Sequence, residues 1–162
     1  MSLINRLKID IRFRIISLLV LIWIVAIFRE KNWSSLYSPL FSIFSFAILD
    51  MGYTYLITKK RYYPFSSLVS GILIALIISP ISSMPVLFLA VIFGFLSKQF
   101  LKVNGRNIFN PAAFGIVVSS LLFQTPISWW SVAPGGWIFL IILFSSLTIY
   151  KLKRLQFPII YL

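Results

Sequence analysis

Six apolar segments, separated by short polar stretches, take up most of this 162-residue chain. A straight helix needs about 20 apolar residues to cross a bilayer, and only the second segment comfortably has that length. The shorter segments have the length of re-entrant or buried membrane pieces. The pattern predicts an all-α fold, a polytopic transmembrane helical bundle with about 5–6 membrane segments, several of them short or broken. The segments are residues 15–28, 36–57, 68–79, 85–96, 111–123 and 137–150.

The overall composition favours a bilayer over water as the solvent of this chain. Hydrophobic residues make up 60% of the sequence and charged residues 11%. Soluble domains contain about 45–50% apolar and about 25% charged residues. The core of a soluble domain cannot hold this much apolar surface, so we expect a single membrane domain over residues 1–162.

Basic residues gather in alternate loops, which explains the net charge of +12 without nucleic-acid binding. The loops 81–84 and 124–136 contain no charge, and 29–31 carries a weak, mixed signal. By the positive-inside rule, the basic loops face the cytoplasm. We therefore expect a multi-pass protein of the inner (cytoplasmic) membrane with a cytoplasmic N-terminus. The clusters are Arg6, Lys8, Arg12 and Arg14, then Lys59, Lys60 and Arg61, then Lys98, Lys102 and Arg106, and last Lys151, Lys153 and Arg154.

Several kinds of active site are excluded by the residues that this chain lacks. It has no cysteine and no histidine, which removes thiolate nucleophiles, iron–sulfur ligation by its own thiolates and the usual general base. Its acidic residues, Asp10, Glu30 and Asp50, are too few for a carboxylate metal cage. We expect no metal site and no catalytic residue on this chain.

Residues 105–115, GRNIFNPAAFG, interrupt the apolar pattern between two hydrophobic segments. Asn110 is a preferred helix N-cap and Pro111 suits the first helical position. The helix over 111–123 would be roughly 20 Å long, too short for a hydrocarbon core of about 30 Å. The free N–H groups at the start of this helix and the neighbouring Arg106 form a candidate binding site for an electron-rich group such as a phosphate or a flavin carbonyl. An ordinary cytoplasmic loop that ends in a normal cap is the alternative.

Three stretches resemble a known family of membrane proteins. They are SGILIAL at 70–76 with Pro80 after it, Lys98-Gln99, and the 105–115 stretch. Together they are similar to the first half of the NqrB/RnfD family. These proteins are the large membrane subunits of the sodium-translocating NADH:quinone reductase and of the Rnf ferredoxin:NAD oxidoreductase. The likeness extends from about residue 66 to the end of the chain, whereas the earlier part is similar only in hydropathy.

The resemblance implies a fold, a cofactor and partners. The family fold has about ten membrane helices in two halves related by pseudo-symmetry, and this chain corresponds to the first half of that longer architecture. A homodimer or a second chain would then supply the other half. The implied cofactor is a non-covalent flavin, riboflavin or FMN. The implied partners are the other subunits of a membrane redox complex and the lipid bilayer, with no nucleic acid. The implied flavin-binding residues are Gly71, Gly105, Arg106, Asn107 and Asn110.

This chain departs from the family pattern at the place where FMN is covalently attached. In the family, a Thr that follows an Ala in a long loop carries the FMN through its phosphate. Here Thr54, Thr58, Thr125 and Thr148 all follow other residues, and the loop 124–136 is short. We therefore expect no covalent FMN on this chain. A second departure is Lys102-Val103, which stands where the family often has paired glycines.

Asp50 lies inside the second apolar segment, where a carboxylate is a functional candidate by default. We predict that it takes part in an ion path, so that Asp50→Asn leaves assembly intact and slows ion-coupled turnover. The alternative is a carboxylate near the membrane interface, paired with Lys59 or Lys60.

Other polar and aromatic residues have structural explanations beside the functional ones. Lys98 fits the topology pattern, and it is also placed to compensate the charge of a reduced flavin. Trp129, Trp130 and Trp137 fit an interfacial aromatic belt, with stacking on a flavin as the alternative. Two glycines are expected to allow close approach of helices, Gly71 and Gly94.

Taken together, the sequence predicts a membrane subunit of a flavin-dependent, ion-translocating electron transport complex. Such a subunit is not a complete enzyme, because hydride and iron–sulfur chemistry belong to its partners. Two alternatives remain open, a small-solute channel or transporter with half-helices, and a non-redox membrane scaffold. A bound flavin distinguishes the first function, and solute flux without a flavin distinguishes the second.

Overall fold

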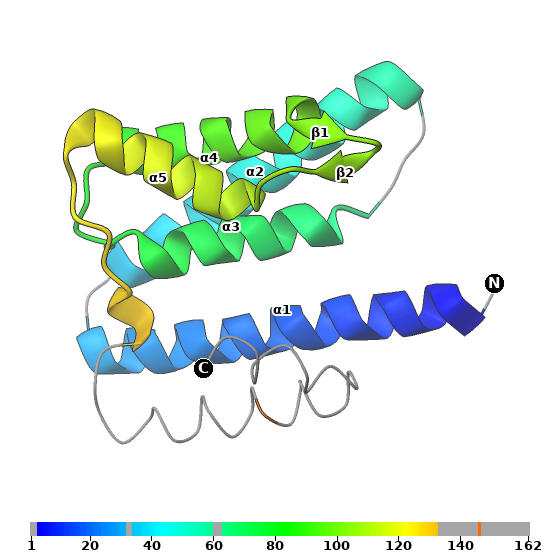
Figure 1. Ribbon diagram of the computed structural model, residues 1–162. Helices are drawn as coiled ribbons and strands as arrows, with labels where there is room; N and C mark the ends of the chain where they lie inside the picture. The colour runs from blue at the N-terminus through cyan, green and yellow to red at the C-terminus, as the bar shows by residue number, and fades with distance from the viewer. Residues whose placement is uncertain (1–2, 32–33, 60–62, 133–145, 147–162) are drawn as a thin grey trace.

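The computed structural model describes residues 3–31, 34–59, 63–132 and 146 (Figure 1). Helices dominate this part of the chain, as the sequence predicts. The predicted segment at 137–150 lies outside the described residues, apart from residue 146. The elements are α1 (Leu3–Glu30), α2 (Ser34–Thr58), α3 (Phe65–Ile77), α4 (Met84–Phe100), β1 (Lys102–Val103), β2 (Arg106–Asn107), α5 (Pro111–Phe123) and the 3₁₀ turn η1 (Trp130–Val132).

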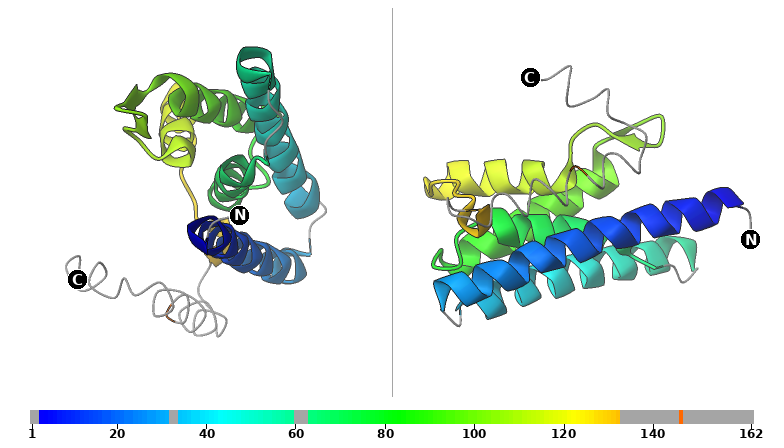
Figure 2. Two further views of the ribbon diagram at one scale, coloured as in Figure 1. Left: turned by 90° about the vertical axis from the view of Figure 1, so that its right-hand side faces the viewer. Right: turned by 90° about the horizontal axis from the view of Figure 1, so that it is seen from below.

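Helix α3 lies at the centre of the group and contacts each of the other four helices. Consecutive helices run in opposite directions, and the end-on view in Figure 2 shows α3 surrounded by α1, α2 and the pair α4–α5. Its length of 13 residues corresponds to about 20 Å. A central helix this short leaves both of its ends within the reach of side chains from its neighbours.

Two apolar clusters hold the helices together. The larger cluster joins α2, α3, α4 and α5 around Phe46, Ile74 and Leu87, all almost fully buried. The smaller one joins α1 to α3 through Leu19 and Ile72. Close van der Waals packing of these side chains holds helices together in a bilayer, so the clusters fix the lateral order of the helices.

Glycines allow the helices to approach backbone to backbone, as expected for Gly71 and Gly94. A Cβ on Gly71 would lie 2.8 Å from the Ile43 Cα of α2, and one on Gly94 would lie 2.9 Å from the Pro111 carbonyl oxygen. Gly115 is tighter still, because its Cβ would lie 2.1 Å from the carbonyl oxygen of Ala90. Small residues at helix contacts are typical of membrane proteins, where packing replaces the hydrophobic driving force.

The outer surfaces of several helices are apolar. Ile48 and Leu56 on α2 and Leu121 on α5 are each about two-thirds exposed or more. Within the described residues, one stretch, Ser35–Thr58, is long and apolar enough to cross a membrane, and three shorter apolar helices accompany it. The membrane character is therefore supported, while the expected number of crossings stays a prediction.

The basic residues gather at one end of the helix group, which we call the basic end. The start of α1, the end of α2, the start of α3 and the end of α4 all lie there (Figure 1). Lys59, Lys98, Lys102 and Arg106 are located at this end. The opposite end carries an ion pair between Arg29 and Glu30, 2.9 Å apart. Basic clusters that alternate with uncharged loops along the sequence thus lie together at one end of the folded chain.

A β-hairpin at the basic end departs from the predicted all-α fold. Strands β1 and β2 pair antiparallel, with Val103 opposite Arg106. Asn104 and Gly105 connect them with φ angles of 52° and 75°. Positive φ at both central residues is the signature of the two-residue hairpin turn that Asn-Gly favours. The sequence contains this signal, and it outweighs the apolar periodicity on both sides of it.

The 3₁₀ turn η1 closes the opposite end of α3. Trp130 donates its indole N–H to the carbonyl oxygen of Ala75 at 2.8 Å, and Ser131 donates its hydroxyl to that of Leu76 at 2.9 Å. These are carbonyls of the last helical turn, which lack partners within the helix. Trp130 is only 9% exposed, so its ring packs within the helix group, and its expected place in an aromatic belt at the membrane interface stays a prediction. Trp129, at 59% exposed, remains compatible with such a belt, and Trp137 lies outside the described residues.

Candidate functional site

A buried polar cluster surrounds the carboxylate of Asp50. The Lys98 ammonium lies 2.8 Å from Asp50 Oδ2, and the Gln99 amide donates to Oδ1 at 2.5 Å. The Ser67 hydroxyl donates to Oδ2 at 2.5 Å and accepts from Lys98 at 2.6 Å. The side chain of Asp50 is 1% exposed and that of Lys98 is 13% exposed. We call these four residues the Asp50 cluster.

Three helices bring the Asp50 cluster together. Asp50 lies one turn beyond Phe46 on the buried face of α2, Ser67 lies in the first turn of α3, and Lys98 and Gln99 lie in the last turn of α4. A cation near a helix C-terminus is stabilised by the helix dipole. A buried charge requires a partner of opposite sign and hydrogen bonds to its remaining atoms, and the cluster provides both to Asp50.

The pairing of Asp50 differs from the sequence-based alternative. Lys59 lies in the open at the end of α2, 6.0 Å from the ring centre of Tyr55, and does not pair with Asp50. Lys60 lies outside the described residues. The explanation of Lys98 by topology alone is also wrong, because its ammonium binds Asp50. The signal for this pair was a lone acid in one apolar helix and a Lys-Gln pair in another.

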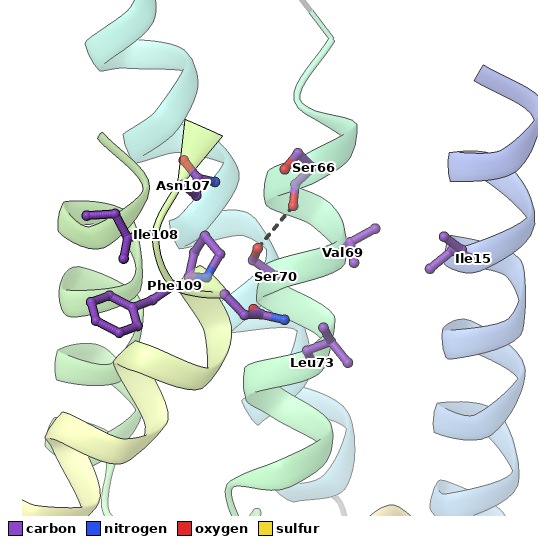
Figure 3. Close-up of a pocket in the computed structure, with 10 residues that line it drawn as sticks. Ile15, Ser66, Val69, Ser70, Leu73, Asn107, Ile108 and Phe109 are labelled. Atoms are coloured by element: carbon purple, nitrogen blue, oxygen red, sulfur yellow. Dashed lines mark hydrogen bonds between the residues drawn. The ribbon is translucent and has the colours of Figure 1, made fainter. Parts of the chain in front are cut away.

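A second feature, a pocket of about 450 Å³, lies between α1, α3 and the segment 107–111 (Figure 3). Ser66, Val69, Ser70 and Leu73 line it from α3, and Ile15 faces them from α1. The Ser70 hydroxyl donates to the Ser66 carbonyl oxygen at 3.1 Å. The other side is formed by Asn107, Ile108, Phe109, Asn110 and Pro111. None of the described side chains in this lining is charged, and these residues suit a neutral ligand with hydrogen-bonding edges.

Asn110 has the N-cap role that the sequence predicts, and this role orients its amide. Asn110 Oδ1 accepts from the backbone N–H of Ala112 at 3.0 Å and of Ala113 at 3.5 Å. Helix α5 begins at Pro111 and ends at Phe123, as predicted. Since the oxygen is taken up by the cap, the amide NH₂ is the group that Asn110 offers to a ligand.

The five predicted flavin-binding residues separate into two groups. Asn107 and Asn110 line the pocket. Arg106 is exposed on β2, Gly105 lies in the hairpin turn with open space around it, and Gly71 faces α2 instead of the pocket. The Gly71 carbonyl oxygen accepts a hydrogen bond from the Ser42 hydroxyl at 2.8 Å. The arrangement therefore leaves the two asparagines as candidate ligand contacts.

The serines of α3 connect the pocket to the Asp50 cluster, and sequence reasoning missed them. Ser66 and Ser70 line the pocket, whereas Ser67 binds Asp50 and Lys98. The signal was present as Ser66-Ser67-x-x-Ser70, three hydroxyls at the start of an otherwise apolar helix. Gln99 was quoted as part of the family motif, but its bond to Asp50 was not foreseen. Within the described residues, no group of three His, Cys, Asp or Glu is placed to hold a metal ion.

Comparison with known proteins identifies the family. The model of the NQR2, RnfD, RnfE family matches residues 5–154. The match therefore begins far before residue 66, where the visible resemblance starts. Neither a curated protein nor a solved structure matches the chain. Members of the family are membrane subunits of Rnf- and Nqr-type complexes, in which other subunits are their partners. Because the match covers nearly all of its length, this chain belongs to the NQR2, RnfD, RnfE family.

Proposed function

We propose that this membrane subunit binds a flavin non-covalently in the pocket beside α3 and couples its reduction to ion movement through Asp50. The single observation that carries the proposal is the shared use of α3, whose serines line the pocket and bind Asp50 within the same helical turns. A redox group and a charge-bearing group on one short helix are the two parts that such coupling requires.

The chemistry of the pocket supports a flavin ring over a phosphate. Its volume of about 450 Å³ lies within the range of about 300–1,000 Å³ usual for small-molecule sites. Val69, Leu73 and Phe109 offer apolar contacts to the faces of a ring. The amides of Asn107 and Asn110 offer hydrogen bonds to its polar edge. Phosphate binding generally uses Arg or Lys side chains, and none is present among the described residues that line the pocket.

Asp50 supports the ion-coupled part of the proposal. A buried carboxylate within a membrane protein is costly, and such groups generally mark ion or proton paths. Reduction of a flavin adds electrons close to α3, and the Lys98 ammonium at the Asp50 carboxylate also contacts α3, through Ser67. A shift of that charge compensates the added electrons.

The basic end is placed in the cytoplasm in this proposal, which gives a multi-pass subunit of the inner membrane with its N-terminus inside. The positive-inside rule supports this orientation. Reporter fusions at Lys31 and Asn104 test it, because those residues lie at opposite ends of the helix group. A cytoplasmic signal from Asn104 and an external one from Lys31 are expected, and the reverse result excludes the orientation.

The flavin is tested by the visible absorbance of the purified chain, repeated on the supernatant after acid precipitation. We expect a flavin spectrum that moves to the supernatant, since no covalent attachment is expected. Ser70→Leu, which fills the pocket, should lower the bound flavin at least tenfold. Ser17→Leu is the matched control, because Ser17 is exposed on α1 and its hydroxyl bonds the carbonyl oxygen of Phe13 as Ser70 bonds that of Ser66.

Each other outcome excludes a part of the proposal. Flavin that stays with the precipitate contradicts the non-covalent attachment. An equal loss of bound flavin in Ser70→Leu and Ser17→Leu contradicts the assignment of the flavin to this pocket. A chain without flavin, together with its co-purifying subunits, favours a transporter or a scaffold, and solute flux in vesicles then separates those two.

A further inference from the structure

We propose that the Asp50 cluster is a monovalent-cation site whose resident occupant is the ammonium group of Lys98. A free monovalent cation enters when Lys98 releases its proton and its side chain withdraws. The inference rests on the ion path of the proposed function and deepens it, but it needs no flavin.

The ammonium nitrogen lies where a cation would bind. It is 2.8 Å from Asp50 Oδ2 and 2.6 Å from Ser67 Oγ, a carboxylate and a hydroxyl oxygen. Asp50 Oδ1 is held by the Gln99 amide, which fixes the plane of the carboxylate. Carboxylate oxygens are preferred ligands of hard cations. The site is therefore already formed around a positive charge.

Charge balance makes the exchange one for one. The carboxylate of Asp50 and the ammonium of Lys98 sum to zero. If Lys98 releases one proton it becomes a neutral amine, and one entering monovalent cation restores the sum to zero. A net charge buried among apolar helices is strongly unfavourable, so these two neutral states are the favoured ones. One proton leaves for each cation that enters.

The position of Lys98 gives its ammonium a way out. Its side chain is 13% exposed, against 1% for Asp50, and it belongs to the last turn of α4 at the basic end. A lysine side chain has a flexible stem of four carbons. The ammonium can therefore move towards the basic end while Asp50 stays buried.

Two titratable side chains among the described residues lie close to the Asp50 cluster. Among the described residues, Lys102 reaches the Gln99 amide oxygen at 3.5 Å. Tyr53 of α2 packs its ring against Phe95 and Phe100. Neither α3, over Phe65–Ile77, nor α5, over Pro111–Phe123, contains a titratable side chain.

The test is the thermal stability of the full chain in detergent, with any co-purifying subunits, in NaCl against choline chloride at equal ionic strength. In Lys98→Met the carboxylate has no resident ammonium, so Na⁺ should raise the Tm at about pH 7 by about 3–6 °C for each tenfold excess over its dissociation constant. The wild-type chain should respond more at about pH 9.5 than at about pH 7, because each entering cation releases one proton and a lower proton concentration favours that exchange. The same measurement in LiCl and in KCl shows which size of cation the site prefers.

Two controls make the result specific. Asp50→Asn/Lys98→Met should lose the Na⁺ response, and Lys102→Met should behave as the wild-type chain. A Na⁺ response in Lys98→Met no larger than in the double variant overturns the proposal. If Lys98→Met does not fold, the wild-type comparison at the two pH values decides in the same way. A Na⁺ response without bound flavin removes only the redox part of the proposed function, and bound flavin without a Na⁺ response removes only this inference.

Discussion

The two ends of the helix group satisfy their polar groups by different means. At the basic end, the buried polar groups are charged side chains, Asp50 and Lys98, with the pocket close by along α3. At the opposite end, they are neutral backbone carbonyls of α3, which accept hydrogen bonds from Trp130 and Ser131. Arg29 also donates to the Trp130 carbonyl oxygen and so holds η1 in place.

This difference indicates which end is able to change state. At the opposite end, Trp130 and Ser131 hold the carbonyls of α3 through hydrogen bonds between neutral groups, and rupture of these bonds would leave buried carbonyls unsatisfied. The ion pair at the basic end has alternative states. Proton transfer can neutralise both groups, and another ion can take the place of one partner. The chemistry of the molecule is therefore expected at the basic end, with the opposite end as its fixed support.

The largest expected effect comes from removal of the Asp50 charge. Asp50→Asn leaves the buried Lys98 ammonium without the carboxylate 2.8 Å away, which should destabilise the chain by about 3–5 kcal/mol. This revises the expectation that the variant assembles normally, which took no account of Lys98. Thermal unfolding in detergent measures the loss. Asp50→Asn/Lys98→Met should recover most of it, and a single variant as stable as the wild type would show that the pair is not buried.

A smaller effect is expected at the opposite end from Trp130→Phe. The ring keeps most of its apolar contact area, but the Ala75 carbonyl loses its donor, at a cost of about 1–3 kcal/mol. Flavin content and the Na⁺ response should not change, because both depend on the basic end. The matched control is Trp129→Phe, whose ring is exposed and whose stability should stay within about 0.5 kcal/mol of the wild type. Loss of flavin in Trp130→Phe would contradict the division between the ends.

The smallest expected effect on stability is at Asn110, where two substitutions separate capping from binding. Asn110→Ala loses the cap of α5 and should cost about 1 kcal/mol. Asn110→Asp keeps a capping oxygen but replaces the amide NH₂ by a charged oxygen. It should therefore retain stability and lose most of the flavin. If Asn110→Asp binds flavin as well as the wild type, the amide does not contact the ligand.

Local signals in the sequence predicted local structure well. The start of α5 follows from Asn110 and Pro111, whose preferences act within a single turn. The gathering of basic residues at one end follows from their alternation along the chain, because short connections force consecutive helices to run in opposite directions. Gly71 and Gly94 lie at close helix contacts for the steric reason expected of them.

Contacts between distant parts of the chain were not predictable in the same way. Asp50 and Lys98 are 48 residues apart, and their pairing depends on which faces α2 and α4 turn towards each other. Charge alone made Lys59 an equally good candidate. The pocket takes its lining from α1, α3 and the segment 107–111, so its volume and neutrality emerge only after packing. The hydrogen bond of Trp130 was not predictable either, because its indole N–H has a partner that only the folded chain supplies.

The angular positions of the serines on α3 have a mechanical consequence. Each residue of an α-helix advances by about 100°, so Ser66 and Ser70 lie about 40° apart around the axis and Ser67 lies about 60° from Ser70. A rotation of α3 by a few tens of degrees would therefore carry its hydroxyls from one neighbour towards the next. The backbones of α3 and α2 are in close contact at Gly71 and Ile43, so α3 would rotate against α2 at this contact. A ligand that twists this helix in the pocket must also change the distance between Ser67 and the carboxylate of Asp50.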